Sequence, residues 1–82
     1  MHVTVRLFAR LREIAGAAEL DRIVPAGSTA RVVWDTLVRD FPELGHYSSM
    51  TSVAVNEEYG RMTTAVNDGD EVAFLPPVSG GR

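Results

Sequence analysis

The chain has 82 residues, a formal net charge of −3 at pH 7, 45% hydrophobic residues and 23% charged residues. These values predict a single globular domain, and the acidic balance argues against general nucleic-acid binding. The sequence contains no cysteine, which excludes a disulfide framework, thiolate metal sites and a cysteine nucleophile.

The N-terminal stretch of residues 2–8 alternates between apolar and polar side chains. Val3, Val5 and Leu7 point one way, and this period of two predicts a half-buried strand. Phe8 breaks the alternation and falls on the polar side. It is either an aromatic residue left exposed at the strand end or a contact for a partner protein.

Residues 9–16 favour a short helical turn that Gly16 closes. Residues 19–24 form a weaker strand candidate, because Leu20 alternates with polar neighbours and Val24 keeps its parity. Residues 25–28 then predict a turn.

One clear helix follows, with Ser28 or Thr29 as its expected N-cap. Pro42 disfavours helical geometry at the residue before it, so the helix is expected to end there. Val32 is the one apolar residue expected on the solvent side. The residues expected in the buried stripe are spaced at helical period and are Ala30, Val33, Trp34, Leu37, Val38 and Phe41.

The segment after this helix is harder to interpret. Residues 43–50 are expected to be irregular, residues 52–56 to form a strand, and residues 56–60 to form a turn or loop. Residues 61–66 can hold one more short strand. The two histidines, His2 and His46, have no neighbours at metal-ligand spacing, so no metal site is predicted.

The end of the chain carries the most specific pattern. Asp68-Gly69-Asp70 predicts a turn, and residues 72–75 form an apolar run of strand length. Pro76 and Pro77 cannot donate to a sheet, so the sheet is expected to end before them. The residues that follow are mostly small: Val78, Ser79, Gly80 and Gly81.

Strands on both sides of a single helix predict an α+β fold, in which the helix packs across one face of a four- to five-stranded sheet. Residues 1–77 are expected to form this domain, and residues 78–82 a flexible C-terminal tail.

The sequence resembles the ubiquitin-like MoaD/ThiS family of sulfur carriers, and within it the small subunits of molybdopterin synthase (MoaD). The resemblance rests on Phe8-Ala9-Arg10-Leu11-Arg12-Glu13, on Ala54-Val55-Asn56 and on the closing motif from Asp68 to Gly81. It covers nearly the whole chain and implies a ubiquitin-like β-grasp with a mixed sheet.

The resemblance also implies a function. In this family an activating enzyme similar to MoeB uses ATP to adenylate the terminal glycine, and a sulfur donor protein converts it to a thiocarboxylate. The tail then enters a large subunit similar to MoaE and delivers sulfur to the pterin precursor of the molybdenum cofactor. The carrier itself binds no cofactor and acts in the cytoplasm, away from nucleic acid and membranes; its catalytic side chains belong to its partners.

The same resemblance assigns roles to residues. Gly81 would carry the adenylate and the thiocarboxylate, and Gly80, Ser79 and Val78 would form the inserted tail. An extended stretch from Val78 to Gly81 reaches about 13 Å. Family members contact the large subunit at positions that match Phe8, Arg12 and Leu75, although Leu75 could equally be a core residue.

Arg82 departs from the family pattern, because family members commonly end at the second glycine. Either Arg82 is removed by a peptidase or it is a peculiarity of this sequence. Three other functions remain open: a carrier for thiamine synthesis or tRNA thiolation, a ubiquitin-like protein modifier, and an interaction domain with a frayed end.

Overall fold

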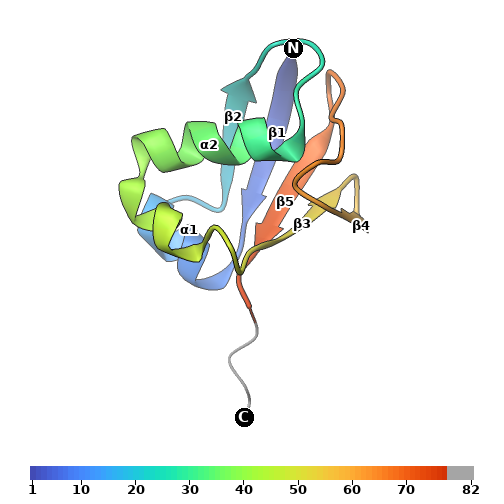
Figure 1. Ribbon diagram of the computed structural model, residues 1–82. Helices are drawn as coiled ribbons and strands as arrows, with labels where there is room; N and C mark the ends of the chain where they lie inside the picture. The colour runs from blue at the N-terminus through green and yellow to red at the C-terminus, as the bar shows by residue number, and fades with distance from the viewer. Residues whose placement is uncertain (78–82) are drawn as a thin grey trace.

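The computed structural model describes residues 1–77, and the predicted tail of residues 78–82 lies outside the described residues. The chain forms one five-stranded mixed sheet with helices on one side of it (Figure 1). In chain order the elements are β1 (His2–Leu7), α1 (Ala9–Ala15), β2 (Glu19–Ile23), α2 (Ala30–Asp40), the 3₁₀ helix η1 (Pro42–Tyr47), β3 (Ser52–Val55), β4 (Glu58–Gly60) and β5 (Glu71–Leu75). This confirms the predicted α+β architecture.

The strand order in the sheet is β2-β1-β5-β3-β4. The two strands at the centre, β1 and β5, are parallel, with Thr4 opposite Glu71 and Leu7 opposite Phe74. All other neighbours are antiparallel. Because β1 and β5 run in the same direction, both finish at the same end of the sheet, and β5 therefore ends beside the β1–α1 connection.

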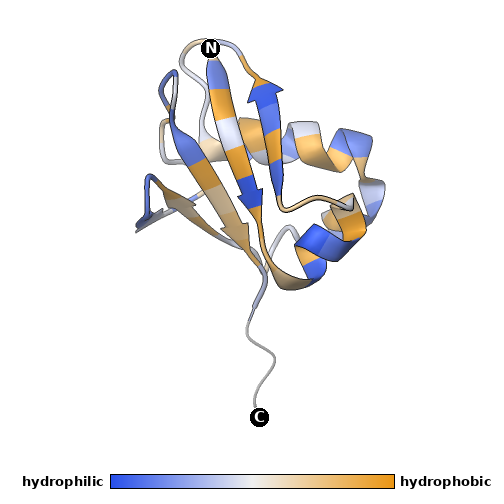
Figure 2. Cartoon of the chain, turned by 180° about the vertical axis from the view of Figure 1, so that it is seen from behind, coloured by the Kyte–Doolittle hydropathy of each residue, from blue (hydrophilic) through white to orange (hydrophobic). Residues whose placement is uncertain are grey.

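The two faces of the sheet differ. The inner face packs against α2, and the outer face lies away from it; the alternation of hydrophilic and hydrophobic residues along β1 is visible in Figure 2. Each inner side chain of β1 and β5 is at most 2% exposed, and so is Val53 of β3. These residues are Val3, Val5, Leu7, Val53, Val72 and Phe74.

Trp34 is the largest side chain of the core and is fully buried, as predicted. Its ring lies 5.0 Å from that of Phe74 in a tilted arrangement, and Nε1 donates to Ser48 Oγ at 2.8 Å. The indole N–H therefore keeps a hydrogen bond while the ring is removed from water. Phe41 and Val38, which were expected to be buried, are only half-buried. Val32, which was expected on the solvent side, also packs partly against the core. The buried stripe of α2 therefore differs slightly from the predicted one.

The start of α2 corrects another prediction. Thr29 occupies the N-cap position, but its side chain makes no capping hydrogen bond, and Ser28 Oγ donates instead to the Pro25 carbonyl. The first amides of the helix donate to the carbonyls of Thr64 and Met62, each at 2.9 Å. The segment 61–66 thus caps the helix through its backbone, which a sequence pattern does not reveal.

The prediction of a strand in residues 61–66 is wrong. The only β-type pairing of this segment is an isolated bridge between Ala65 and Thr29. The strand that the sequence did not predict is β4, which lies inside residues 56–60, a stretch expected to be a turn or loop. Asn56 and Glu57, with φ of 52° and 70°, form the two-residue connection of a tight hairpin, and Val55 pairs with Glu58. The segment after α2 is likewise more regular than predicted, because it forms η1.

Candidate functional site

The outer face is hollowed alongside β5, between the second half of β1 and the β3–β4 hairpin. A shallow depression of about 260 Å³ lies there. We call it the outer depression, and its lining residues are Arg6, Phe8, Ala54, Glu57, Tyr59, Glu71, Ala73 and Leu75. Residues from both ends of the chain build it, because β1 and β5 are neighbours in the sheet.

Phe8 follows β1 directly and keeps an outward position. Ala9 has a φ of 52°, in the left-handed region that few residues other than glycine adopt, and this turns the chain sharply into α1. The amide of Leu11 donates to the Phe8 carbonyl at 3.1 Å and fixes the turn. The side chain of Phe8 therefore remains 38% exposed beside the end of the sheet.

Arg6 organises the charged side of the outer depression. Its guanidinium lies 5.9 Å from the centre of the Phe8 ring and 3.3 Å from Glu71 Oε2. The cation over the ring contributes on the order of 0.5–1 kcal/mol at such an exposed site. The exposed ion pair adds little stability, so its main effect is to hold Arg6 against the aromatic ring.

Leu75 ends β5 on the outer face and is half-buried, so it belongs to the outer depression and not to the sealed core. The sequence could not decide between these two roles. Phe8 and Leu75, both predicted as partner contacts, thus lie on one surface.

Arg12 does not line the outer depression. It is exposed on α1, a helix that contacts β5, and within residues 1–77 it has no ion pair. The nearby Arg10 differs: it pairs with Glu13 at 3.2 Å and Glu43 at 3.5 Å. Hydrogen bonds to Tyr47 and Glu13 raise the pKa of Arg10 above its ordinary value.

Tyr59 is the functional candidate that the sequence did not reveal. It is 77% exposed, pairs with Ala54 across the β3–β4 hairpin, and forms the far wall of the outer depression. Its position depends on the register of that hairpin, and the only signal in the sequence was an aromatic residue soon after Asn56.

Asn56, part of the family-like motif, has a structural role. Its amide group donates to Asp70 Oδ1 at 2.9 Å and accepts from the Glu71 amide at 3.0 Å. Asp68 also accepts from a backbone amide, that of His2, at 2.7 Å. The carboxylates of the closing motif therefore tie β5 to its neighbours and do not form an acid–base pair.

The rest of the described chain offers no competing site of the metal or membrane type. Residues 1–77 contain no group of three histidine, aspartate or glutamate side chains placed to hold a metal ion. No helix within that range combines the length and apolar character needed to cross a bilayer. The predicted tail residues Val78, Ser79, Gly80 and Gly81 lie outside the described part.

Comparison with known proteins adds the family. The sequence model of the ThiS family matches residues 5–81. The chain is 42% identical over 81 residues to the molybdopterin synthase sulfur carrier subunit of Arabidopsis thaliana, covering 99% of this chain and 84% of the relative.

Solved structures agree on the fold. The crystal structure of SAMP1, a small archaeal modifier protein of Haloferax volcanii, superposes with a TM-score of 0.85 at 32% identity, covering 99% of this chain and all of that one. A chain from the complex of subunits 1 and 2 of the molybdopterin-converting factor of Helicobacter pylori gives 0.68 at 22% identity, over 99% and 100%. These neighbours confirm the ubiquitin-like β-grasp.

Proposed function

Since the chain belongs to the ThiS/MoaD family of ubiquitin-like sulfur carriers, we propose that it is the sulfur carrier subunit of a molybdopterin synthase. The observation that supports this most is the match of the family model through residue 81, which includes both glycines. Relatives with that name, similar over nearly the full length of the chain, agree with it.

The proposed chemistry takes place on Gly81. A carboxylate is a poor acyl donor, because oxide is a poor leaving group. A carboxylate oxygen therefore attacks the α-phosphorus of ATP on an activating enzyme, which releases pyrophosphate. A sulfide equivalent from a donor protein then attacks the carbonyl carbon, AMP leaves with the C–O electron pair, and a thiocarboxylate remains. Its sulfur bonds to the pterin precursor in the large subunit, and water then releases Gly81 as a carboxylate.

The outer depression supports a role in docking. Phe8, Tyr59 and Leu75 present apolar surface beside the point where the tail leaves β5. Aromatic residues next to a depression are the side chains that most often anchor protein interfaces. We propose that the large subunit covers this surface while Gly80 and Gly81 enter its active site, and that Arg12 binds a carboxylate or carbonyl at the rim.

Arg82 decides whether Gly81 can react. In the 82-residue chain the Gly81 carbonyl is part of a peptide bond, so it offers no carboxylate oxygen to ATP. We expect the 82-residue chain to give no pyrophosphate with the activating enzyme, and a version that ends at Gly81 to give it. Equal release from both, with Arg82 still present by mass spectrometry, contradicts the assignment of Gly81.

A second function has a specific observation in its favour. The structure with a TM-score of 0.85 is that of a protein named a modifier. The two functions are separated by immunoblot and intact-mass analysis of cell extract. A carrier gives one species, with one oxygen exchanged for sulfur, whereas a modifier gives a ladder of covalent adducts.

A further inference from the structure

Every basic side chain of this protein except the two histidines is an arginine. The sequence has eight arginines, no lysine and no cysteine. A guanidinium stays protonated at all physiological pH values and has no free electron pair for an acyl carbon, whereas a lysine amine is neutral part of the time. The choice of arginine therefore affects reactivity as well as charge.

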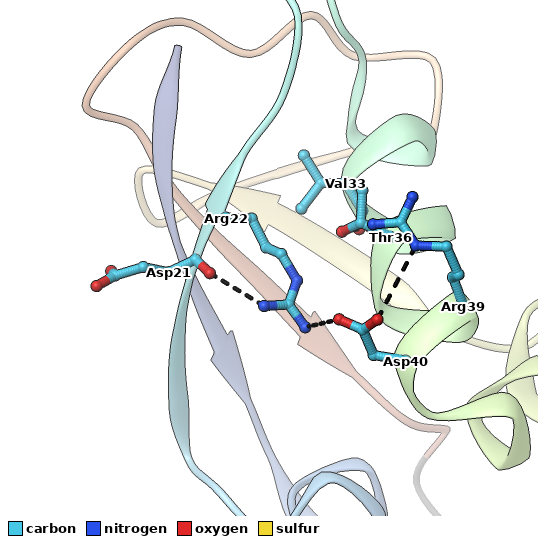
Figure 3. A network of polar contacts seen from close by, with 6 residues as sticks. All are labelled: Asp21, Arg22, Val33, Thr36, Arg39 and Asp40. Atoms are coloured by element: carbon cyan, nitrogen blue, oxygen red, sulfur yellow. Dashed lines mark hydrogen bonds and ion pairs between the residues drawn. The ribbon is translucent and has the colours of Figure 1, made fainter.

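Some arginines are required by geometry. Arg22 joins the edge strand β2 to the end of α2: Nη1 donates to the Asp21 carbonyl at 3.1 Å, and Nη2 to Asp40 Oδ2 at 2.8 Å (Figure 3). A single ammonium group cannot span two acceptors in this arrangement as the planar fork does. Arg6, between Phe8 and Glu71, is a second example.

Other arginines have no such requirement. Within residues 1–77, Arg12, Arg31 and Arg61 are exposed and make no ion pair. The side chain of Arg39 is 75% exposed and only approaches Asp40, at 3.9 Å. Lysine would fit the fold at these positions equally well, so the described contacts do not explain its absence.

The amine of Met1 is held by the fold. It donates to the carbonyl of Val24 at 2.7 Å in a partly buried position. Met1 also lies at the end of the domain opposite to the end of β5 (Figure 1). Because this nitrogen is partly buried, an acyl group reaches it less easily than it would reach an exposed lysine amine.

We propose that this chain is an acyl donor with no side-chain amine to accept an acyl group and with its one amine, at Met1, partly buried, so that its activated terminus is preserved for partner molecules. The proposal rests on the proposed function, in which Gly81 becomes an acyl-adenylate. An amine that attacks this group forms a C–N bond at the Gly81 carbonyl carbon, AMP leaves with the C–O electron pair, and the amine loses a proton to water. No side chain here supplies that nitrogen, and acyl groups on His2 or His46 would hydrolyse.

The proposal is tested without an activating enzyme. The chain ending at Gly81 is prepared as a thiophenyl ester and incubated at about pH 10, where a large share of lysine amines is neutral. Covalent dimers with the mass of two chains less one thiophenol are then measured. We expect the parent mainly to hydrolyse, and Arg39→Lys and Arg61→Lys to form about tenfold more dimer, because an exposed lysine amine is easier to reach than the partly buried Met1 amine. Arg39→Gln is the matched control and should behave as the parent.

Two results overturn the proposal: parent dimers as abundant as those of the lysine variants, or lysine variants that hydrolyse without dimers. Because the ester is made chemically, failure here is distinct from failure of the proposed function, which would appear as no pyrophosphate release from ATP.

The Met1 amine is tested by acetylation with an N-hydroxysuccinimide ester. With no lysine present, stable acetylation at an amine can occur only at Met1, so one mass shift reports on it. We expect a chain extended by Gly-Ser before Met1 to react about tenfold faster, since its amine is released from the Val24 carbonyl. Equal rates contradict the claim that the fold restrains this amine.

Discussion

The two faces of the sheet are built from the same strands but serve different purposes. On β5, Val72 and Phe74 point inward and are fully buried, while Glu71, Ala73 and Leu75 point outward and line the outer depression. The inner face of β1 and β5 is aliphatic and aromatic throughout. The outer face combines an ion pair with apolar residues that keep part of their surface in water. One face thus determines stability, and the other is available for recognition.

The sharpest test of this division compares adjacent residues. Phe74→Ala should lower the free energy of unfolding by about 3–5 kcal/mol, because it removes a buried ring and leaves a cavity beside Trp34. Leu75→Ala, one residue later, should cost about 1 kcal/mol or less. Urea unfolding followed by Trp34 fluorescence measures both. Similar losses for the two variants would show that the faces are not distinct.

The next test concerns binding. Phe8→Ala should weaken association with the large subunit by at least about 1 kcal/mol in calorimetry and leave the melting temperature nearly unchanged. Ile23→Ala is the matched control, because Ile23 is 73% exposed at the far end of β2 and does not line the outer depression. An equal effect of both substitutions would argue against a localised docking surface.

The smallest expected effect concerns the turn between β3 and β4, at the margin of the outer face. Glu57 has a φ of 70°, so Glu57→Gly should raise the free energy of unfolding by about 0.5–1 kcal/mol through relief of the left-handed backbone. Glu58→Gly, in β4, should lower it by a similar amount. Thermal unfolding of the pair reports the two signs, and a loss of stability in Glu57→Gly would contradict the assigned turn.

Much of the fold could be predicted from local patterns. The alternation in residues 2–8, the helical spacing around Trp34 and the apolar run before Pro76 each depend on neighbours in sequence, and the structure confirms them. β4 was missed because its hairpin turn uses Asn56 and Glu57 where a glycine would have marked it. The segment 61–66 was mistaken for a strand because its backbone partner is the start of α2, far away in sequence.

The site was predictable in part for the same reason. Phe8 stood out because it breaks the strand alternation, and it lines the outer depression. Its role as a partner contact stays a prediction. Tyr59 reaches that surface only through the register of β3 and β4, and no local pattern encodes this register. The roles of Gly81 and its neighbours remain predictions.

The parallel pairing of β1 and β5 has a consequence for how the molecule forms. Residues 4–7 pair with residues 71–74, so the central contact of the sheet closes a loop of nearly the whole chain. Contacts of such long range are slow to form, because the loop must be closed first, and β5 is synthesised after all the other described elements. The outer depression therefore exists only after Arg6 and Phe8 have met Leu75. A large subunit that recognises this surface would therefore bind only completed molecules.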